Sequence, residues 1–245
     1  MTNQGSQALI RASRALAKAV DTLEFADPVR YVYNPLDYAR EPFERYLSKY
    51  GGEKKRVLFL GMNPGPWGMA QTGVPFGEID SVANWMGITG EVGAPPSEHE
   101  KRRIAGFDCV RSEVSGKRLW GLMRDRFGTP EAFFADHFVS NYCPLIFIEE
   151  SGRNRTPDKL PKIERDALCL HCDDHLRRTI EIIDPEWLVG IGAYAEKRLR
   201  LVSHSPRIAS ILHPSPANPA ANRGWAEAAT SQLIDLGVWS EKDLE

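Results

Sequence analysis

One short segment constrains the fold more than any other part of the chain: the apolar run Arg56–Leu60, which ends abruptly in the loop Gly61–Gly68. A dense run of branched and aromatic side chains is typical of a buried strand. The prolines of the loop fix its backbone, and its glycines let the backbone approach a ligand closely. We therefore predict a buried strand that opens into a constrained loop, with any ligand bound beyond the carboxyl end of that strand.

Strand-like and helix-like segments alternate along the rest of the chain. Three further strands are predicted at Phe138–Ser140, Trp187–Ile191 and Arg207–Leu212. Helical spacing of apolar residues predicts helices at Ala8–Leu23, at Leu36–Tyr50 with an interruption at Pro42, at Ser81–Trp85, at Lys117–Phe127 with Ser115 as the N-cap, at Leu160–Ile183, at Ala193–Val202 and from about Trp225. This alternation predicts an α/β fold with a mainly parallel sheet and helices on both faces.

Length and composition predict one domain. A chain of 245 residues with 42% hydrophobic and 26% charged residues can bury a single large core. We expect residues 1–245 to form that domain, with residues 1–50 as N-terminal helices packed on it. The segment from Glu91 to Arg103 has the least ordered pattern. A monomer is the expected state.

The sequence pattern predicts neither a membrane protein nor a secreted one. It has no run of eighteen apolar residues, and Arg11, Arg14 and Lys18 interrupt its first apolar stretch. We therefore expect an intracellular protein, in the cytoplasm or nucleoid of a bacterium or in the nucleus of a eukaryote. A net charge of −2 argues against a protein that coats nucleic acid indiscriminately. The basic clusters at Lys101–Arg103 and Arg153/Arg155, taken alone, are more typical of solvated faces.

The four cysteines allow two interpretations. Cys169 and Cys172 have the C-x-x-C spacing of zinc and iron–sulfur ligand pairs. No second pair exists, and Cys109 and Cys143 are isolated in the sequence. Reduced thiols on a helix are the favoured interpretation, and we expect neither a metal nor a cofactor.

Three polar residues fall at predicted strand ends. Asn63 lies three residues after the first strand, Asn141 directly follows the second, and His213 directly follows the fourth. Each by itself could be a turn residue that satisfies local backbone. Three at equivalent strand ends indicate a shared site, because the carboxyl ends of parallel strands meet at one edge of a sheet.

The residue types at this edge favour a planar ligand over a nucleotide. The loop Gly61–Gly68 lacks the glycine orders that cradle nucleotide phosphates. Phe76 could bring an aromatic ring to the site, although such a residue is more often plain core. The amide of Asn141 carries an acceptor and a donor, the pair that reads the N3–H and O4 edge of uracil or thymine. His213 can donate a hydrogen bond or stabilise charge on an oxygen.

These residues resemble the single-strand-selective monofunctional uracil-DNA glycosylases. The matching blocks are GMNPGPWGMAQTGVPFGE (61–78), RSEVSG (111–116), NYCPL (141–145), SGRN with TP after it (151–157) and HPSPANPAANRGW (213–225). The resemblance implies a uracil-DNA glycosylase fold, in which helices flank a central parallel four-stranded sheet. It implies hydrolysis of the N-glycosidic bond of uracil in single- or double-stranded DNA, the first step of base excision repair. 5-Hydroxymethyluracil and related oxidised pyrimidines are further expected substrates.

The resemblance also implies residue roles. Asn63 resembles the residue that holds and polarises the attacking water, and His213 resembles the one that stabilises negative charge on uracil O2. Phe76 resembles the ring that stacks on the flipped base, and Asn141 the amide that reads its edge. Met62 resembles the backbone donor beside O2.

Further positions concern the fit of the base and of the DNA. Gly65 stands where the family keeps space near C5 of the base. The predicted DNA-binding residues are Ser215, Pro216, Ala217, Asn218 and Arg223. Two positions depart from the family pattern: Trp67 replaces a familiar Phe, and Ala217 replaces an Arg that the family often carries in the segment that wedges into the duplex. The second departure puts the strength of duplex binding in question.

The chemistry of these motifs predicts a metal-free hydrolysis. Loss of a uracil anion requires electrostatic stabilisation of the leaving group more than a strong nucleophile. Neither motif contains a lysine, so no amine is present for a Schiff base. Two alternatives stay open: an iron–sulfur uracil glycosylase of the same fold, and a non-enzymatic single-strand-binding module in which Phe76 and Trp67 only stack bases.

Overall fold

The computed structural model describes residues 3–205 and 207–241. Its helices are α1 (Gln4–Val20), α2 (Pro35–Tyr38), α3 (Arg40–Tyr50), α4 (Met69–Thr72), α5 (Val114–Phe127), α6 (Pro130–Asp136), α7 (Lys162–Ile183), α8 (Ala193–Val202) and α9 (Trp225–Asp235). Its strands are β1 (Val29–Tyr33), β2 (Val57–Gly61), β3 (His137–Asn141), β4 (Ile146–Glu149), β5 (Asn154–Arg155), β6 (Trp187–Ile191) and β7 (Ile208–Ile211). Residues 1, 2, 206 and 242–245, which the predicted single domain includes, lie outside the described part.

The central sheet has four parallel strands in the order β3-β2-β6-β7. All five residues of β2 are buried, because the strand pairs on both sides and helices cover both faces. The chain runs from β2 outward to β3 and later adds β6 and β7 on the other side of β2. A reversal of this kind leaves a crevice beyond the carboxyl ends of the central strands. The predicted α/β class and its four-stranded parallel sheet are confirmed.

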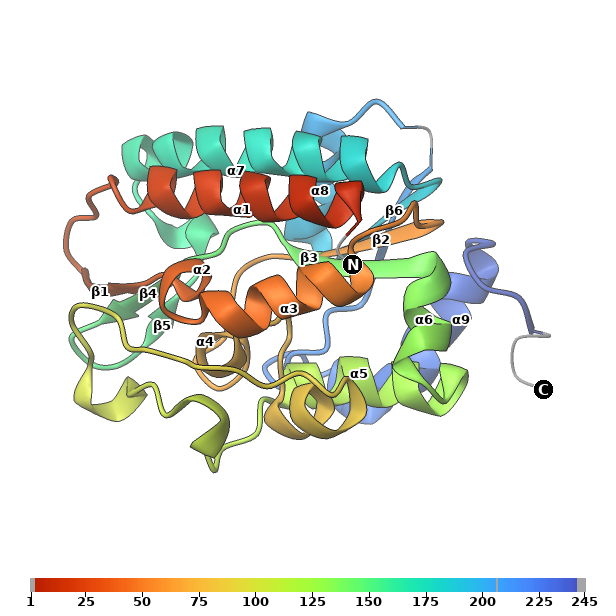
Figure 1. Ribbon diagram of the computed structural model, residues 1–245, viewed down its shortest axis with the longest axis horizontal. Coiled ribbons are helices and arrows are strands. Elements are labelled where there is room, and N and C mark those ends of the chain that lie inside the picture. Colours follow the sequence, from red (N-terminus) through yellow and green to blue (C-terminus); the bar gives the residue numbers. More distant parts are fainter. Residues whose placement is uncertain (1–2, 206, 242–245) are drawn as a thin grey trace.

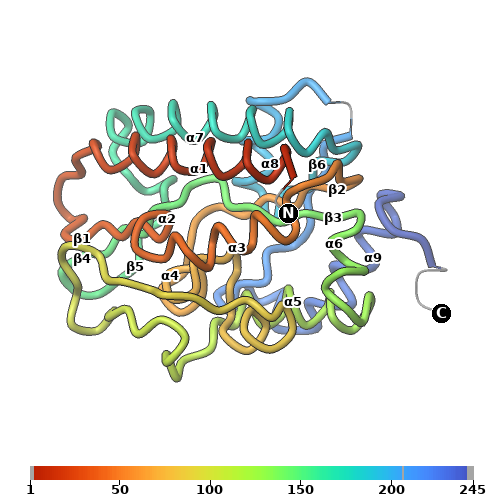
Figure 2. Tube along the Cα trace, in the orientation of Figure 1, coloured from red at the N-terminus to blue at the C-terminus, as the bar shows by residue number. Residues whose placement is uncertain are grey.

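Helices cover the sheet on two sides (Figure 1). The helices α1 and α7 run side by side along one side, and α5, α6 and α9 lie on the other, as the trace in Figure 2 also shows. Leu9 of α1, Leu176 of α7, Phe59 of β2 and Leu119 of α5 belong to one continuous hydrophobic core. The N-terminal helix therefore packs on the same core as the sheet.

A second, three-stranded sheet of order β1-β4-β5 was not predicted. Its strands are antiparallel, and β1 pairs with β4, so that Tyr33 lies opposite Ile146. The strands β1 and β4 are far apart in the sequence, so no local pattern predicts that they pair. The strand β5 has only two residues, too few for a recognisable pattern. The strands β4 and β5 lie along the segment of chain that connects Asn141 to Asn154.

Several predicted boundaries were wrong for local reasons. Ser115 is not the N-cap of α5, because the helix begins at Val114 with Glu113 at the N-cap. The break predicted at Pro42 lies at Ala39, since a proline in the first turn of a helix costs no hydrogen bond. Asn141 is the last residue of β3 rather than the first beyond it. The predicted helix at Ser81–Trp85 is a single π-helical turn.

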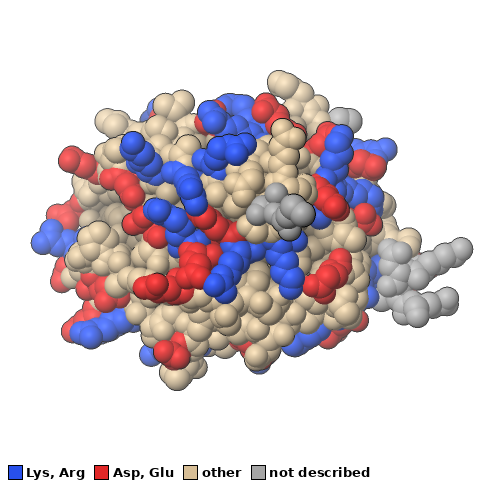
Figure 3. Space-filling model, viewed as in Figure 1, with Lys and Arg blue, Asp and Glu red and all other residues tan. Residues whose placement is uncertain are grey.

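The surface over α1 and α3 carries both signs of charge (Figure 3). Ion pairs such as Arg14–Glu44 join the two helices there. Neither sign dominates this face, which agrees with the net charge of −2. Within residues 3–205 and 207–241, none of the helices combines the length and the apolar character that a membrane crossing requires.

Candidate active site

A cavity of about 330 Å³ lies beyond the carboxyl ends of β2, β3 and β7. Its lining residues are Met62, Asn63, Pro64, Gly65, Phe76, Glu113, Ser115, Asn141, Asn154, Thr156, His213 and Ser215. The structure thus brings together all six residues predicted for catalysis and base binding. Of the predicted DNA-binding residues it places Ser215 in the cavity wall and Pro216, Ala217, Asn218 and Arg223 outside it.

Backbone hydrogen bonds position Asn63. The N–H of Tyr142 donates to the carbonyl of Gly61 and the N–H of Cys143 to that of Met62, which extends the pairing of β2 and β3 into the loop. Asn63 Nδ2 in turn donates to the Leu145 carbonyl at 3.1 Å. This bond fixes the amide plane and leaves Oδ1 as an acceptor for a small ligand such as water.

Asn141 presents an unused acceptor. Its Oδ1 is buried and has no hydrogen-bond partner among the described residues. In the described part of the chain its Nδ2 contacts only a weak acceptor, the Met69 sulfur at 3.3 Å. Because an unsatisfied buried polar atom costs free energy, this amide is suited to a ligand that offers a donor beside an acceptor.

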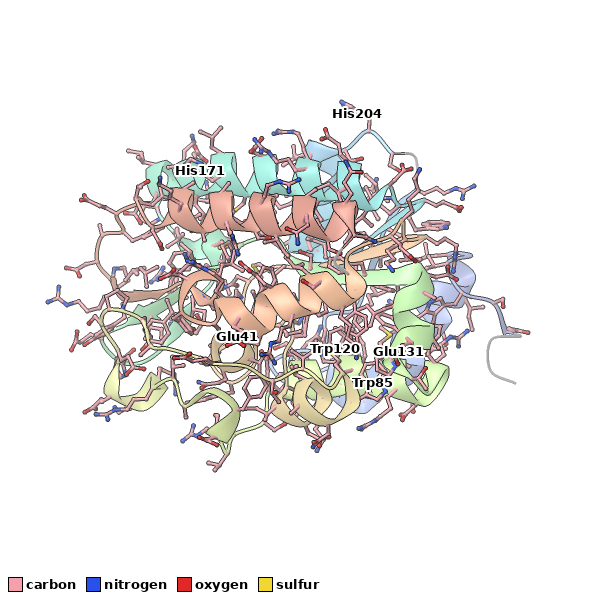
Figure 4. All side chains as sticks on the ribbon, in the orientation of Figure 1. Glu41, Trp85, Trp120, Glu131, His171 and His204 are labelled. Atoms are coloured by element: carbon pink, nitrogen blue, oxygen red, sulfur yellow. The ribbon has the colours of Figure 1, made fainter. Side chains whose placement is uncertain are left out.

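Phe76 forms the aromatic wall in a rarely populated backbone conformation. Its φ is 52°, which is unusual for a residue other than glycine. The conformation is held because the Phe76 carbonyl accepts hydrogen bonds from Trp120 Nε1 at 3.0 Å and from the Glu78 N–H at 2.7 Å. Trp120 lies on α5 and packs near Trp85 (Figure 4). Backbone strain that is locked in this way is typical of functional sites.

His213 is held neutral with a defined tautomer. Burial lowers the pKa of its imidazole below the ordinary 6.5. Its Nδ1 accepts the N–H of Ser215 at 3.1 Å, so the ring proton lies on Nε2, which is left as a donor. The ring centroid lies 6.3 Å from that of Phe76. His171 and His204 lie apart from this group, on the outer side of α7 and beyond the end of α8 (Figure 4).

The segment that follows His213 is shaped by its own side chains. Ser215 Oγ accepts the N–H of Ala217 at 3.2 Å, and Asn218 Oδ1 accepts the N–H of Ala220 at 3.0 Å. Such side-chain turns fix a loop without regular structure. Ala217 is exposed at the outer surface of this loop and offers only a methyl group.

The helix α5 holds the same segment, residues 214–223, through hydrogen bonds. Arg118 of α5 donates to the Pro214 carbonyl at 3.0 Å and to Asn222 Oδ1 at 2.9 Å. Arg223 follows in a short 3-10 turn and is exposed. The loop is therefore a stiff, exposed rim beside the cavity.

Trp67 does not line the cavity. The guanidinium of Arg111 lies 4.5 Å from its ring centroid and that of Arg102 lies 5.2 Å away. These cation–π contacts occupy the ring. Trp67 thus organises two cations outside the cavity instead of stacking on a ligand inside it.

Comparisons with known proteins agree with this geometry. Residues 48–233 match the family model described as the uracil DNA glycosylase superfamily. A protein of Rattus norvegicus named single-strand selective monofunctional uracil-DNA glycosylase is 49% identical over 220 residues, 88% of this chain and 79% of the relative. The Mus musculus protein of the same name is 45% identical over 241 residues, 97% of this chain and 86% of the relative. The chain belongs to the single-strand selective monofunctional uracil-DNA glycosylase family.

A solved structure extends the likeness to the fold. The crystal structure of wild-type SMUG2 from Pedobacter heparinus matches with a TM-score of 0.70 at 21% identity, and the match covers 96% of this chain and 99% of that chain. At this identity the likeness concerns the fold alone. The predicted uracil-DNA glycosylase fold is confirmed.

Besides Pro64 of the predicted loop, four lining residues of this family member were missed as site residues: Glu113, Ser115, Asn154 and Thr156. All four lie in blocks that carried the family resemblance, which was the available signal, but nothing in the local pattern assigned them a role. Asn154 Oδ1 is buried without a hydrogen-bond partner in the described part of the chain. Burial, and then the nearby Glu78, raise the pKa of Glu113 to about 7.

The cysteines of this family member are free thiols. Cys169 and Cys172 lie on α7 and are buried, and so is Cys143. Within residues 3–205 and 207–241, no group of three or more His, Cys, Asp or Glu side chains is arranged to hold a metal ion. The C-x-x-C pair belongs to the packing of α7.

Proposed function

We propose that this chain is a monofunctional DNA glycosylase that hydrolyses the N-glycosidic bond of uracil in DNA, the first step of base excision repair. The observation that carries the proposal is the buried Asn141 Oδ1, which has no partner among the described residues and lines a cavity of about 330 Å³. Membership of the uracil-DNA glycosylase superfamily and the names of the curated relatives support the same activity.

In this proposal different cavity residues contact different edges and faces of the base. Asn141 Oδ1 accepts the N3–H of uracil and Nδ2 donates to O4, a pattern that cytosine presents in reverse. The Phe76 ring stacks on the base, and the backbone N–H of Met62 lies on the O2 side. To reach this cavity the base must leave the stack, which costs a few kcal/mol in a duplex and less in a single strand.

Bond breaking follows from the same arrangement. The bond between C1′ and N1 breaks heterolytically, so its electron pair leaves with uracil, and the negative charge spreads over the ring oxygens. The Nε2–H of His213 donates to O2 and stabilises that charge, as a preorganised donor does in other anionic transition states. A water held by Asn63 Oδ1 then adds to C1′, because the sugar has become electrophilic, and the proton that this water loses neutralises the departed uracil anion. Asn63 orients this water and does not deprotonate it as a carboxylate would.

The rim beside the cavity is the proposed DNA-binding surface. We propose that Ser215, Pro216, Ala217, Asn218 and Arg223 contact the strand beside the flipped base, since a stiff loop with exposed backbone groups suits phosphate contacts. We propose that the enzyme acts on both single- and double-stranded DNA. The chain would act as one domain and as a monomer, in the compartment that holds the DNA: the cytoplasm or nucleoid of a bacterium, or the nucleus of a eukaryote.

A single assay tests the activity. The purified protein is incubated with a single-stranded oligonucleotide that contains one uracil, and half of each sample is heated in alkali. Strand cleavage only after alkali is the expected result, because a monofunctional glycosylase leaves an abasic site intact. Persistent absence of an alkali-labile product, together with measurable binding, would favour the single-strand-binding module instead. His213→Ala serves as the slow control.

A further inference from the structure

Glu113 occupies an unusual position at the start of α5. It is the N-cap residue, yet its side chain makes no capping hydrogen bond, unlike the shorter Ser, Thr, Asp and Asn side chains that usually satisfy a free N–H of the first turn. Its carboxyl group instead lines the cavity. The side chain is therefore directed away from the helix and toward the site.

The glycine-rich loop leaves space for this carboxyl group. A Cβ atom built on Gly65 would overlap Glu113 Oε1, and one built on Gly68 would overlap Oε2. Only residues without a side chain allow the carboxyl to lie this close to the loop backbone. Two of the glycines that mark the loop in the sequence are thus explained by a residue of a different element.

The carboxyl group lacks a partner. Glu113 Oε2 is buried and has no hydrogen bond to any described residue. The neighbouring Glu78 differs, because its Oε2 accepts from the N–H and Oγ of Ser81 at 3.0 and 2.8 Å and its Oε1 accepts from Ser112 Oγ at 3.0 Å. Of the two carboxyl groups, that of Glu78 is fully engaged in structure, whereas that of Glu113 keeps Oε2 unpartnered against Gly68 and places Oε1 beside Gly65 in the cavity wall.

The orientation proposed for the base leaves one edge for Glu113, and this step rests on the proposed function. Asn141 takes the N3–H and O4 edge, Met62 and His213 take O2, and N1 is joined to the sugar. The remaining edge is C5–C6, and we assign it to the part of the cavity wall where the Glu113 carboxyl lies against Gly65. Pro64, Ser115, Asn154, Thr156 and Ser215 complete the lining. Uracil itself has no polar atom on C5, so it cannot satisfy this carboxyl group.

We propose that Glu113 is a specificity-determining residue that hydrogen-bonds to a hydroxyl-bearing substituent on C5 of the flipped base. A hydroxymethyl group is suited to this contact because a hydroxyl both donates and accepts. A neutral carboxyl group is also compatible with the chemistry, whereas a carboxylate would repel the departing uracil anion. Burial and Glu78 favour the neutral form, since they raise the pKa of Glu113 to about 7.

Single-turnover rates on two bases test the proposal. Wild type, Glu113→Met and Glu113→Gln are compared on single-stranded oligonucleotides that contain uracil or 5-hydroxymethyluracil. Methionine matches glutamate in length and cannot form the hydrogen bond, so the ratio of the 5-hydroxymethyluracil rate to the uracil rate should fall about tenfold. Glutamine keeps a donor and an acceptor, and should hold the ratio within about threefold of wild type. Glu131→Met is the matched control, because Glu131 lies in the first turn of α6, away from the cavity (Figure 4).

The outcomes separate the two proposals. A wild type that removes neither base overturns the proposed function. A wild type that removes uracil, with a Glu113→Met variant that loses both rates equally, overturns only the role of Glu113. The same holds if glutamine fails to rescue the ratio. Should Glu113→Met not fold, as judged by its thermal transition, Glu113→Ala gives the same comparison with a smaller side chain.

Discussion

At the scale of single residues, the site combines fixed neutral groups instead of charged ones. His213 is neutral because it is buried, and its Nδ1 is already bonded to the Ser215 N–H. Asn63 is fixed by Leu145. A neutral donor can stabilise a developing anion without the desolvation cost of a buried cation. That these two residues share a site was predictable from the sequence because both follow strand ends, whereas their roles are implied by the family resemblance and stay predictions. Glu113 was not, because only the packing of α5 against the loop brings it there.

Replacing His213 by Ala tests the neutral donor. We expect the single-turnover rate on uracil to fall by roughly 10²–10³, the usual effect of losing one preorganised oxyanion donor. The affinity for a uracil-containing oligonucleotide should change little, because the contact forms mainly in the transition state. Rates at saturating enzyme and a separate binding titration distinguish the two. A normal rate would remove His213 from the mechanism.

A double-mutant cycle tests whether Gly65 acts through Glu113. A methyl group at position 65 would displace the Glu113 carboxyl, so Gly65→Ala should reduce the rate on 5-hydroxymethyluracil more than the rate on uracil. In a Glu113→Ala background the same substitution should have a smaller effect, because the clash is gone. Rates of all four proteins on both bases complete the cycle. Additive losses would show that Gly65 acts through backbone geometry alone.

At the scale of elements, the parallel sheet was predictable and the small sheet was not. The strands β2, β3, β6 and β7 each show a local apolar run and alternate with helices. The segments β1 (VRYVY) and β4 (IFIE) also carry strand-forming residues, but which strand each pairs with is not visible locally. Pairing over such a sequence separation depends on the finished fold. The helix α5 shows a related limit, because its N-cap residue Glu113 faces the cavity instead of capping the helix. Propensity alone therefore favoured Ser115.

The exposed loop that follows His213 contains Ala217, a position at which the chain departs from the family pattern. Ala217 is exposed and its N–H is fixed by Ser215 Oγ, so a longer side chain there would project outward without disturbing the loop. In the wild type, extrusion from a stable duplex should be less favourable than from a mismatch or a single strand, and activity should rank single strand and U·G above U·A. Ala217→Arg adds a cation and a filler for the stack, and should raise the U·A rate more than the single-strand rate.

The comparison for Ala217 is a ratio of rates within one protein, so differences in enzyme quality cancel. Ala217→Gln is the matched control, because it adds length without charge and separates filling of the stack from attraction to phosphate. A wild type that prefers U·A, or an unchanged ratio in Ala217→Arg, would place the wedge elsewhere in the loop, with Asn218 and Arg223 the next residues to test.

At the scale of the whole molecule, buried titratable groups oppose one another in their effect on stability. Burial lowers the pKa of His137 and of His175 to about 4, from an ordinary 6.5. The neutral form of His137 is also fixed by Trp239, whose Nε1 donates to its Nε2 at 3.0 Å. The unfolded chain binds protons at these histidines more readily, so stability is lost as the pH falls from 6.5 toward 4. Each histidine should lower the free energy of unfolding by about 2 kcal/mol at pH 5.

Glu113 acts in the opposite direction, and this yields a test that does not involve activity. Its folded pKa of about 7 lies above the ordinary 4.5, so the folded state binds the proton more tightly and stability is lost as the pH rises from 4.5 through 7. Glu113→Gln removes this loss. The free energy of unfolding of the variant relative to wild type should therefore increase by about 2–3 kcal/mol between pH 5 and pH 8. Urea unfolding at pH 5, 6.5 and 8 measures it, with Glu131→Gln as an exposed control. The loss of stability at acid pH should persist in the variant, because the histidines are unchanged. If the free energies of unfolding of the two proteins instead change with pH by the same amount, Glu113 does not titrate in this range.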